Sequence, residues 1–564
     1  MNHIATGTAP SLDGELLPPH GSSSGDEDGG GVDGGAFRGH FPVPAACRNR
    51  DSCPPDLGFA MAAALEGVAG EVDDPVEEVA SEVPPGLTAQ RCVAFQWEPD
   101  GKYLRYSRQG KEEGAVTDGL LQLDGEDVTS PHTRFFLEPS KEHDGQRLLH
   151  VRCCYDNKYL AAVQGPHSGG GAWIIGATDE AEEDLSKATC TLFKTTASDR
   201  RPGYVRFVHA HLGMYACMSE QTLRLSLQEG DGLDAASGHG DIIIHDLSRS
   251  LVLPRYLVFK GDNGMYLRPR IIGRQKYVQF SAAGAADQSL VNTVHGNQDG
   301  TFRVWSNHFG KFWRRSPNWI FCDSDAAAAA GDVDTLFRAT RFGSSVALQN
   351  LGNNWYCKRL TTEGKNNCLN AGAPTITADA RLRLEEAVVS REIYDVVFDL
   401  SGTRVYGKTS VVGMATASAH NDDTASSTTA ELTLECRHTE RRTWASSVTM
   451  SLGVTAKIHA GVPHVAAGGN MEVAEDELSG LYSWGSSMEK ETRKDVAYQV
   501  TVPPKTKVTV TMVATRAYCD VPFSYKQRDT LFDGQQVTHD MNDGLYTGEN
   551  CFDFEYVITS QEMI

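Results

Sequence analysis

Few residues of this 564-residue chain are spaced in a way that supports catalysis. Residues 21–25 (GSSSG) match the G-x-S-x-G pattern of a serine nucleophile, but that pattern needs a strand before it and a helix after it, and the flanking sequence predicts neither. Glu475 and Glu477 are paired carboxylates in a predicted hairpin, where nothing would hold a substrate. The sequence lacks HExxH, P-loop and metal-spaced Cys/His motifs. We therefore expect a protein that is not an enzyme and that uses no metal and no cofactor.

Overall charge and cysteine content narrow the class of protein. The formal net charge of −22 argues against a nucleic-acid surface, which needs clustered Lys and Arg. The first twenty residues have neither the basic nor the apolar region of a secretory signal, and no stretch approaches the roughly 18 apolar residues of a membrane-spanning helix. The 13 cysteines are odd in number and form no C-x-x-C pair. These features favour a reduced, cytoplasmic location.

Residues 1–88 form an acidic leader rich in Gly, Ser, Asp, Glu and Pro. The leader holds 15 acidic residues against three arginines, so more than half of the net charge lies there. Such a composition cannot bury enough apolar surface to offset the entropy of an ordered chain. We expect the leader to be disordered.

An internal repeat begins at Gln90, where the sequence changes to short strand-like segments separated by Gly, Asn and Asp turns. Each copy is a turn followed by an aromatic residue and a short run, as in DGKYLRY, DNKYLAA and NGMYLRP. Four short strands per copy and three copies per closed core make a β-trefoil, so six copies predict two trefoils, at residues 89–248 and 252–387. The repeat aromatics, which we expect to fill the two barrel cores, are Tyr103, Tyr159, Tyr215, Tyr266, Phe312 and Trp355.

Polar residues in the repeat turns allow two interpretations. Their side chains either satisfy the turn itself, which we favour, or hydrogen-bond a sugar hydroxyl. The residues concerned are Asp156, Asn157, Asn263, Asn353 and Asn354.

Three segments of the repeat region, VRCCYDNKYLA, SNHFGKFWRRSPNWIFCDS and LQNLGNNWYCKRLTTEGKNNCLNAG, resemble the amaranthin-type agglutinins, plant lectins built from two β-trefoils. The resemblance covers residues 90–386 and is stronger in the second trefoil. It implies binding of N-acetylgalactosamine or galactose-containing glycans by shallow loops, with a dimer completing the site. An aromatic such as Trp313 would stack on the sugar while amides fix its hydroxyls. The loop candidates for sugar contacts are Tyr155, Asn157, Trp313, Arg314 and Asn318.

Residues 390–564 have long Thr/Ser-rich strands with few turns, which suit extended, partly exposed ribbons. One stretch of eleven residues alternates strictly between apolar and small or polar side chains, the pattern of a strand with one apolar face. Breaks at residues 461–463 and 468–469 lead to a second, less regular run. We interpret residues 446–484 as a β-hairpin that packs on a soluble protein or lines a membrane barrel. Its apolar residues are Val448, Met450, Leu452, Val454, Ala456 and Ile458.

The order of this hairpin, a VPPKTKVTV strand, a DVPF turn and an FDGQQV…DGLYTG segment resembles the aerolysin-type β-pore-forming toxins over residues 390–561. The resemblance implies an elongated β-sheet domain and a hairpin stored on the monomer. It also implies a ring-shaped oligomer, because only a closed barrel satisfies strand edges in lipid. The membrane-inserting residues would be the six apolar residues above and Val462.

The return strand of the hairpin fits insertion less well. Glu475 and Glu477 share a face with Met471 and Val473, whereas acidic residues 472 and 476 lie on the other face. A carboxylate facing lipid costs up to a few kcal/mol near mid-depth, so the cluster lies at the membrane boundary, is protonated or rearranged, or belongs to a chain that no longer inserts. Two histidines near the tip, at positions 459 and 464, are expected to be solvated turn residues, with pH sensing as the alternative.

Two functional hypotheses follow from the sequence. The first is a galactose-type lectin of plant defence, coupled to an oligomerising pore-forming module that becomes membrane-associated. The second is a multivalent cytoplasmic stress lectin whose C-terminal module only oligomerises. In both, the expected fold class is all-β: two tandem β-trefoils, then an elongated aerolysin-like β-sheet domain, preceded by a disordered leader.

Overall fold

The protein is an all-β molecule, and the predicted fold class is confirmed. The one α-helix in the described part, α1 (Ala326–Ala329), is four residues long. None of the helices in that part has the length and hydropathy needed to span a bilayer. The predicted leader, residues 1–88, lies outside the described residues. The structure, a computed structural model, describes residues 90–97, 101–107, 120–143, 148–164, 172–198, 201–218, 224–229, 240–285, 287–446, 452, 454–474 and 481–564.

Twelve strands of the first body form a closed ring and three hairpins. In the ring β1 pairs with β4 and β12, and the circuit continues through β5, β8 and β9. The hairpins β2–β3, β6–β7 and β10–β11 pair with one another through β7. The strands are β1 (Arg91–Trp97), β2 (Tyr103–Ser107), β3 (Leu120–Gly125), β4 (Phe135–Pro139), β5 (Leu148–Cys153), β6 (Tyr159–Gln164), β7 (Ala172–Thr178), β8 (Leu192–Ala197), β9 (Val205–His209), β10 (Tyr215–Met218), β11 (Leu225–Gln228) and β12 (Ile242–Asp246).

The second body repeats this plan. Its ring runs through β13, β16, β17, β20, β21 and β24, and a bridge between Val346 and Leu382 closes it. Its hairpins β14–β15, β18–β19 and β22–β23 pair with one another. A six-stranded ring with three hairpins is the strand plan expected for a β-trefoil. The strands are β13 (Tyr256–Lys260), β14 (Tyr266–Ile272), β15 (Gln275–Ala282), β16 (Asn292–Gly296), β17 (Phe302–Ser306), β18 (Lys311–Ser316), β19 (Trp319–Ser324), β20 (Phe337–Phe342), β21 (Ser345–Asn350), β22 (Trp355–Thr362), β23 (Lys365–Ala373) and β24 (Arg383–Glu386).

The repeat aromatics do not fill the barrels, which corrects the sequence-based prediction by one residue in five repeats and by two in the sixth. In the first five repeats the aromatic pairs across its turn with an outward-facing residue of the preceding strand, as Tyr103 pairs with Gln96. In these repeats the aromatic therefore faces outward and the next residue faces the core. In the sixth repeat Trp355 pairs with the buried Asn350, and the residue that enters the core is Cys357, two positions after the aromatic. Trp355 is even 41 % exposed. The six residues that enter the cores are Leu104, Leu160, Ala216, Leu267, Trp313 and Cys357.

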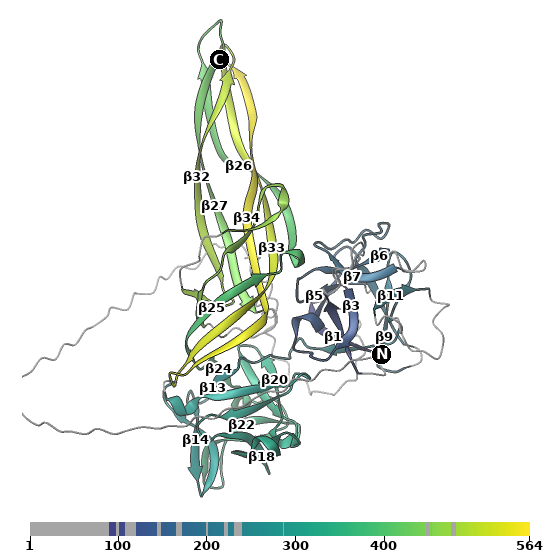
Figure 1. Ribbon diagram of the computed structural model, residues 1–564, viewed down its shortest axis with the longest axis vertical. Helices are drawn as coiled ribbons and strands as arrows, with labels where there is room; N and C mark the ends of the chain where they lie inside the picture. The colour runs from purple at the N-terminus through teal and green to yellow at the C-terminus, as the bar shows by residue number, and fades with distance from the viewer. Residues whose placement is uncertain are drawn as a thin grey trace, which may run out of the picture. The chain divides into compact units, whose positions relative to one another are not determined.

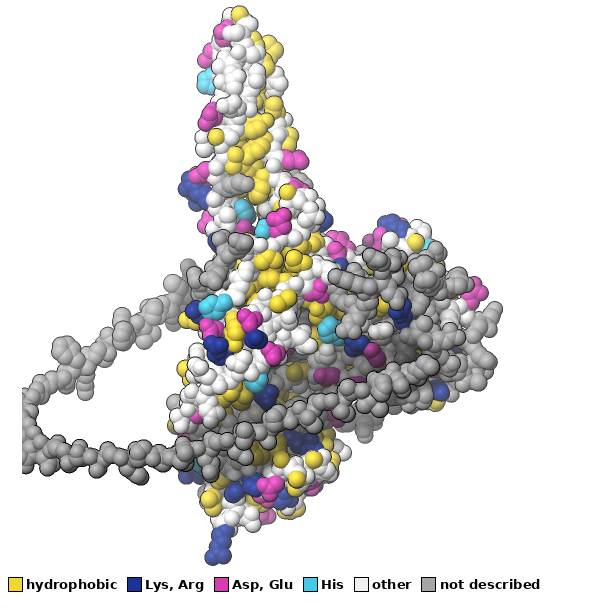
Figure 2. Space-filling view, viewed as in Figure 1, with side chains coloured by type: hydrophobic (Ala, Val, Ile, Leu, Met, Phe, Trp, Pro, Cys, Tyr) yellow, Lys and Arg dark blue, Asp and Glu magenta, His cyan; other side chains and the backbone are white. Residues whose placement is uncertain are grey.

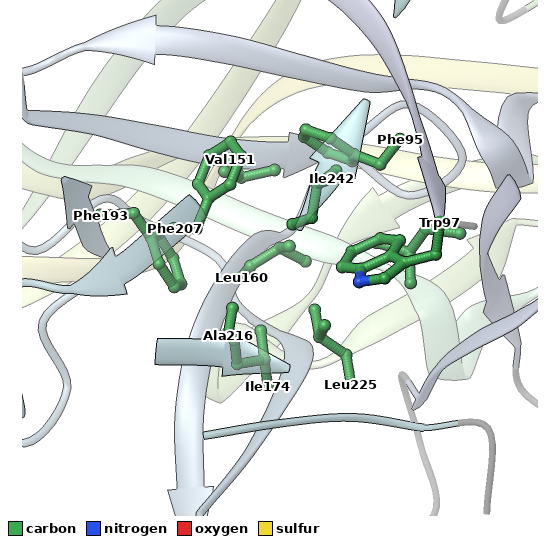
Figure 3. A pocket seen from close by; sticks show the side chains of 11 residues that line it. Phe95, Trp97, Val151, Leu160, Ile174, Phe193, Phe207, Ala216, Leu225 and Ile242 are labelled. Carbon is green, nitrogen blue, oxygen red and sulfur yellow. The ribbon is translucent and has the colours of Figure 1, made fainter. Parts of the chain in front are cut away.

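A small apolar cavity of about 20 Å³ lies inside the first barrel (Figure 3). Its lining includes Trp97, Leu160, Ala216 and Leu225. Ala216 has the smallest side chain among the six core residues that follow the repeat aromatics, so the third repeat leaves the space that a larger residue fills elsewhere. Because the lining is hydrophobic, the cavity is a packing defect and not a ligand site.

Ala216→Val should fill this cavity and raise the free energy of unfolding by about 1 kcal/mol, because the added methyl groups gain contacts without displacing their neighbours. Urea unfolding of the full chain measures the change. Ala371→Val, in the tightly packed core of the second body, is the matched control and should destabilise by overpacking. Equal destabilisation by both substitutions would contradict this account of the cavity.

The third body is built on long strands that run side by side (Figure 1). The strand β33 is central, because it pairs with β25 and β26 along one edge and with β34 along the other. The strand β27 pairs with β32 and, over its last residues, with β34. The strands are β25 (Val388–Phe398), β26 (Arg404–Asn421), β27 (Thr428–Ser446), β28 (Thr455–Ile458), β29 (Val462–Val465), β30 (Met471–Ala474), β31 (Leu481–Ser483), β32 (Ser487–Val502), β33 (Thr506–Leu531) and β34 (Gln536–Met563).

Two hydrophobic clusters stabilise the third body. One surrounds Trp444, Phe523 and Tyr546, where the strands β28 and β29 pack on the sheet. The other lies among the long strands and includes Leu434, Val510 and their neighbours. In Figure 2 hydrophobic side chains also form a stripe along these long strands. Long strands can therefore be stable here although much of their length carries Ser and Thr.

The eleven cysteines of the described part are free thiols, and ten of them are buried. Burial raises the pKa of Cys217 and that of Cys519 to about 12. These thiols are protonated at neutral pH and are therefore poor nucleophiles.

Candidate functional site

Trp313 lies in the core of the second body, and this corrects the prediction that its ring stacks on a sugar. The indole is 0 % exposed. It packs against Phe259 at a centroid distance of 5.2 Å and against Phe337 at 6.2 Å. Phe312, the preceding residue, takes the outward position instead. Arg314 is half-buried, and its guanidinium donates two hydrogen bonds to Asp323, at 3.0 and 2.7 Å.

Asn318 belongs to a hydrogen-bonded turn. Its side-chain oxygen accepts a hydrogen bond from Asn353 Nδ2 at 3.3 Å, and its backbone carbonyl accepts one from the Ala371 amide at 2.7 Å. Asn353 Oδ1 in turn accepts from the backbone N–H of Trp355 at 3.1 Å. Asn318 and Asn353 therefore hold the turns together, which is the interpretation favoured for Asn353 from the sequence.

Tyr155 and Asn157 lie in the turn between β5 and β6 and contact the third body. The Tyr155 ring stacks on His132 at 3.9 Å, and its hydroxyl donates to Asp399 at 3.1 Å. Asn157 has a φ of +59° and is 5 % exposed, and its Nδ2 donates to Asp520 at 3.1 Å. A sugar can reach these two residues only after the bonds to Asp399 and Asp520 open.

The outward repeat aromatics define a kind of site that the sequence analysis missed. Four repeats carry a group of three residues on the barrel surface, here called an outer triad. It consists of the aromatic, its partner across the turn and a third residue on the neighbouring ring strand. The third residue is two positions beyond the residue that pairs with the partner. Glu138, for example, is two positions beyond Phe136, which pairs with Arg152. Spacing gives one signal in the sequence: the partner precedes the aromatic by six or seven residues. The outer triads are Gln96–Tyr103–His245, Glu138–Arg152–Tyr159, Lys260–Tyr266–Glu385 and His295–Trp305–Phe312.

Two outer triads are acid–base–tyrosine groups. Glu138 accepts hydrogen bonds from Arg152 Nε at 2.8 Å and from the Tyr159 hydroxyl at 2.9 Å. Burial opposes ionisation of Glu138, but the Arg152 guanidinium outweighs it and lowers the pKa of this carboxyl. Burial, with the Glu138 charge, raises the pKa of Tyr159 to about 12. These groups satisfy one another, so the triad acts as a structural clamp.

The same chemistry recurs in the fourth repeat, where the Tyr266 hydroxyl donates to Glu385 at 2.9 Å and the Lys260 ammonium lies 4.7 Å from the ring centre. The His295–Trp305–Phe312 triad differs in being aromatic throughout. The Trp305 and Phe312 rings meet edge to face at 4.9 Å, and the His295 ring meets Phe312 at 5.2 Å.

The predicted membrane-inserting residues lie in the chain between β27 and β32. Val448 and Met450 are outside the described residues. Leu452 is half-buried against the core cluster of the second body. Val454 is half-buried against a cluster that contains residues of the second and third bodies. The buried members, Ala456, Ile458 and Val462, are 0 %, 0 % and 4 % exposed within the core of the third body.

The strand predicted for residues 448–458 lies partly outside the described residues, which include 452 and 454–458 of this stretch. Within the described part of this stretch β28 (Thr455–Ile458) is a strand, and its alternation of exposed and buried residues is as predicted. It pairs in parallel with β25 and antiparallel with β31. The predicted return residues Met471 and Val473 pair instead with β29, and residues 468–469, both with positive φ, form that turn. His459 Nε2 lies 2.9 Å from Glu392 Oε1, so this histidine is not a free turn residue.

One cluster in the first body has metal-ligand chemistry. Ligand atoms of Glu142, His143 and Glu183 lie within 4.8 Å of one another. The Glu183 carboxylate, however, already accepts hydrogen bonds from the backbone of Lys141 and Glu142 at 2.9 and 2.7 Å. Partial burial opposes its ionisation, but these bonds outweigh that effect and lower the pKa of Glu183 to about 2. The carboxylate thus joins two loops, and the geometry gives no reason to assign a metal.

Comparison with known protein families finds similarity in the first two bodies. A model of the Agglutinin domain family matches residues 90–219 and 251–385, one segment in each of the first two bodies. The chain thus carries two agglutinin-type segments, and a module of long strands follows them. Natterin-1 of Thalassophryne nattereri is 29 % identical over 180 residues, which are 31 % of this chain and 48 % of Natterin-1. The chain therefore spans about half the length of this curated relative.

Solved structures similar to parts of the chain include toxins and an immune protein. A lamprey immune protein is 14 % identical and covers 56 % of this chain and 92 % of its own, with a TM-score of 0.26. The aerolysin-like protein of Bombina maxima is 14 % identical, covers 30 % and 99 %, and has a TM-score of 0.20. Parasporin-2 of Bacillus thuringiensis is 16 % identical, covers 38 % and 88 %, and has a TM-score of 0.19. Scores this low carry no structural argument.

Trp313→Ala should lower the free energy of unfolding by about 3–5 kcal/mol, because it removes a fully buried indole. Arg314→Ala, which removes a partly exposed ion pair one residue away, should cost less than about 1 kcal/mol. Urea unfolding of both full-length variants checks the difference. A Trp313→Ala protein with wild-type stability and weakened glycan binding would restore the original prediction.

Proposed function

We propose that this chain is a lectin for N-acetylgalactosamine- or galactose-type glycans, and that its third body is an oligomerising, β-barrel pore-forming module. Two agglutinin-type segments support the glycan-binding part. The specificity, the dimer formed by the lectin bodies and the role in plant defence rest on the amaranthin resemblance. The proposal involves no catalytic step, no metal and no cofactor. Storage in a reducing cytoplasm suits the free buried thiols.

The observation that carries the pore proposal is the position of the insert, defined as residues 447–486. It joins β27 to β32, which pair in one antiparallel ladder that ends with Thr443 opposite Ser487. Continuing this ladder would place residue 447 opposite 483. In the structure Ser483 instead lies opposite Thr455. The stored insert and a continued hairpin therefore differ by a slide of eight residues between its two arms.

The continued register also sorts the faces of the hairpin. Its turn would fall at Val465, and Glu475 and Glu477 would lie opposite residues 455 and 453, on the small and polar face. That face suits a wet lumen. The six alternating apolar residues would share the other face with acidic residues 472 and 476, which must then be protonated or lie outside the hydrocarbon.

Oligomerisation follows from backbone chemistry. A released hairpin in lipid has unpaired N–H and C=O groups along both edges, and these are satisfied only when neighbouring hairpins close a barrel. Before release, Ala456 and Ile458 of the apolar face are buried on the third body. Release costs this burial and the pairing with β25 and β31.

A disulfide between Thr455→Cys and Ser483→Cys should abolish pore formation, because it fixes the stored register of β28 and β31. The measurement is dye release from vesicles that display terminal galactose and N-acetylgalactosamine, with and without reductant, and reductant should restore release. The matched control joins Thr443→Cys to Ser487→Cys, a pair that is opposite in both arrangements, and should leave release unchanged. Full release by the oxidised 455–483 variant would exclude the slide.

A second candidate function is a multivalent stress lectin whose third body only oligomerises. The acidic residues on the apolar face of the continued hairpin favour it. It predicts agglutination of glycan-bearing vesicles without dye release and without ring-shaped oligomers in electron micrographs. The wild-type chain in the same vesicle assay separates the two functions.

A further inference from the structure

One residue position differs among the six repeats in a way that changes the barrel surface. It is the position that pairs with the outward aromatic, or with Tyr356 in the sixth repeat. Where it is Gln96 or Gln349, the side-chain amide donates to a turn carbonyl, at 2.7 and 2.8 Å. In the second and fourth repeats it is the base of an acid–base–tyrosine triad. The six residues are Gln96, Arg152, Val208, Lys260, Trp305 and Gln349.

Trp305 is the aromatic member of this set, and its surroundings form a small shelf. Phe312 is 8 % exposed, and the rings of Trp305 and His295 each contact it edge to face, at 4.9 and 5.2 Å. Trp305 is half-buried and His295 is exposed. Aromatic rings fixed in this way offer apolar surface to the C–H face of a sugar without losing rotamer freedom on binding.

Polar groups border the shelf. Thr293 pairs with Trp305 across the strands, and its hydroxyl donates to Asn307 Oδ1 at 2.8 Å. This bond orients the exposed Asn307 amide and leaves its NH₂ group as a donor. Among the described residues, neither ring nitrogen of His295 has a hydrogen-bond partner, so the imidazole offers one donor and one acceptor when neutral. Burial lowers the pKa of His295, which favours that neutral form.

The groups around the shelf favour an uncharged sugar. The triad has no carboxylate, unlike the triads that contain Glu138 and Glu385. At the edge of the shelf Lys311 forms an ion pair with Asp325, so neither charge is left over. The amide of Asn307 and the neutral imidazole of His295 suit the hydroxyls of a neutral sugar, and the Arg255 charge, which also acts on His295, favours this neutral imidazole.

We propose that the His295–Trp305–Phe312 triad binds the terminal hexose of a neutral glycan, with Trp305 stacking on the sugar ring and His295 and Asn307 bonding its hydroxyls. This inference rests on the proposed lectin function and assigns a site to it. The residues lie within the second agglutinin-type segment. The site is separate from the β5–β6 turn, whose Tyr155 and Asn157 are occupied by the third body.

The test compares full-length wild type with Trp305→Ala, His295→Ala and Trp355→Ala on a glycan array, followed by titration of the best-bound neutral mono- or disaccharide. Trp305→Ala should weaken binding at least ten-fold and His295→Ala about three- to ten-fold. Trp355→Ala is the matched control, because it removes a more exposed tryptophan of the same body, and should change affinity less than two-fold. Thermal unfolding verifies that all variants are folded.

Sugar should also protect Trp305 from oxidation by N-bromosuccinimide, read out by mass spectrometry, which tests the contact in the unaltered protein. Loss of binding in Trp355→Ala with wild-type binding in Trp305→Ala would overturn the site while leaving the lectin function in place. A wild-type chain that binds no glycan on the array would instead overturn the lectin function. A change in oligomeric state without a change in affinity in Trp305→Ala would identify the shelf as a contact between copies.

Discussion

Cross-strand pairing at the repeat turns is the constraint on which both barrels depend. In five of the six repeats the aromatic lies opposite an outward-facing residue, so the backbone alone decides that the next side chain enters the core. Inside, that position accepts residues as different as Ala216 and Trp313, with a cavity where the smaller one leaves space. Outside, the aromatic and its cross-strand partner belong to an ion-paired clamp in one repeat and to an aromatic shelf in another. The fold thus separates residues that determine stability from residues free to acquire binding chemistry.

A second ladder governs the third body. The β27–β32 pairing can be extended without a new topology, because the insert already joins the two strand ends. In the structure the insert is held by short contacts, since β28 pairs with each neighbour over three residues. Pairing over so few residues contributes little to stability, whereas burial of Ala456 and Ile458 in an aromatic core contributes more. Stability of the stored state therefore depends on side-chain packing more than on backbone hydrogen bonds.

The repeat, the strand-rich composition and the all-β class follow from the sequence because turn residues and alternation are local signals. Which face of each strand points into the core does not follow from the sequence. A period of two shows that Phe312 and Trp313 point in opposite directions, but only the register with β17 shows which of them is inside. The partners of Tyr155 and Asn157 lie 244 and 363 residues away, so no local pattern reveals that these turn residues contact Asp399 and Asp520. Alternation in the sequence predicts the strand β28 (Thr455–Ile458), but it does not reveal that this strand pairs with β25 and β31.

The buried thiols give the molecule a set of internal probes. Burial raises the pKa of Cys217 to about 12, of Cys368 to about 11 and of Cys519 to about 12, and each of these residues belongs to a different body. An alkylating reagent can therefore modify each thiol only when the body around it opens. Alkylation rates resolved by peptide mass spectrometry would follow the opening of the two barrels and of the long-stranded module separately, in one sample of the unmodified chain.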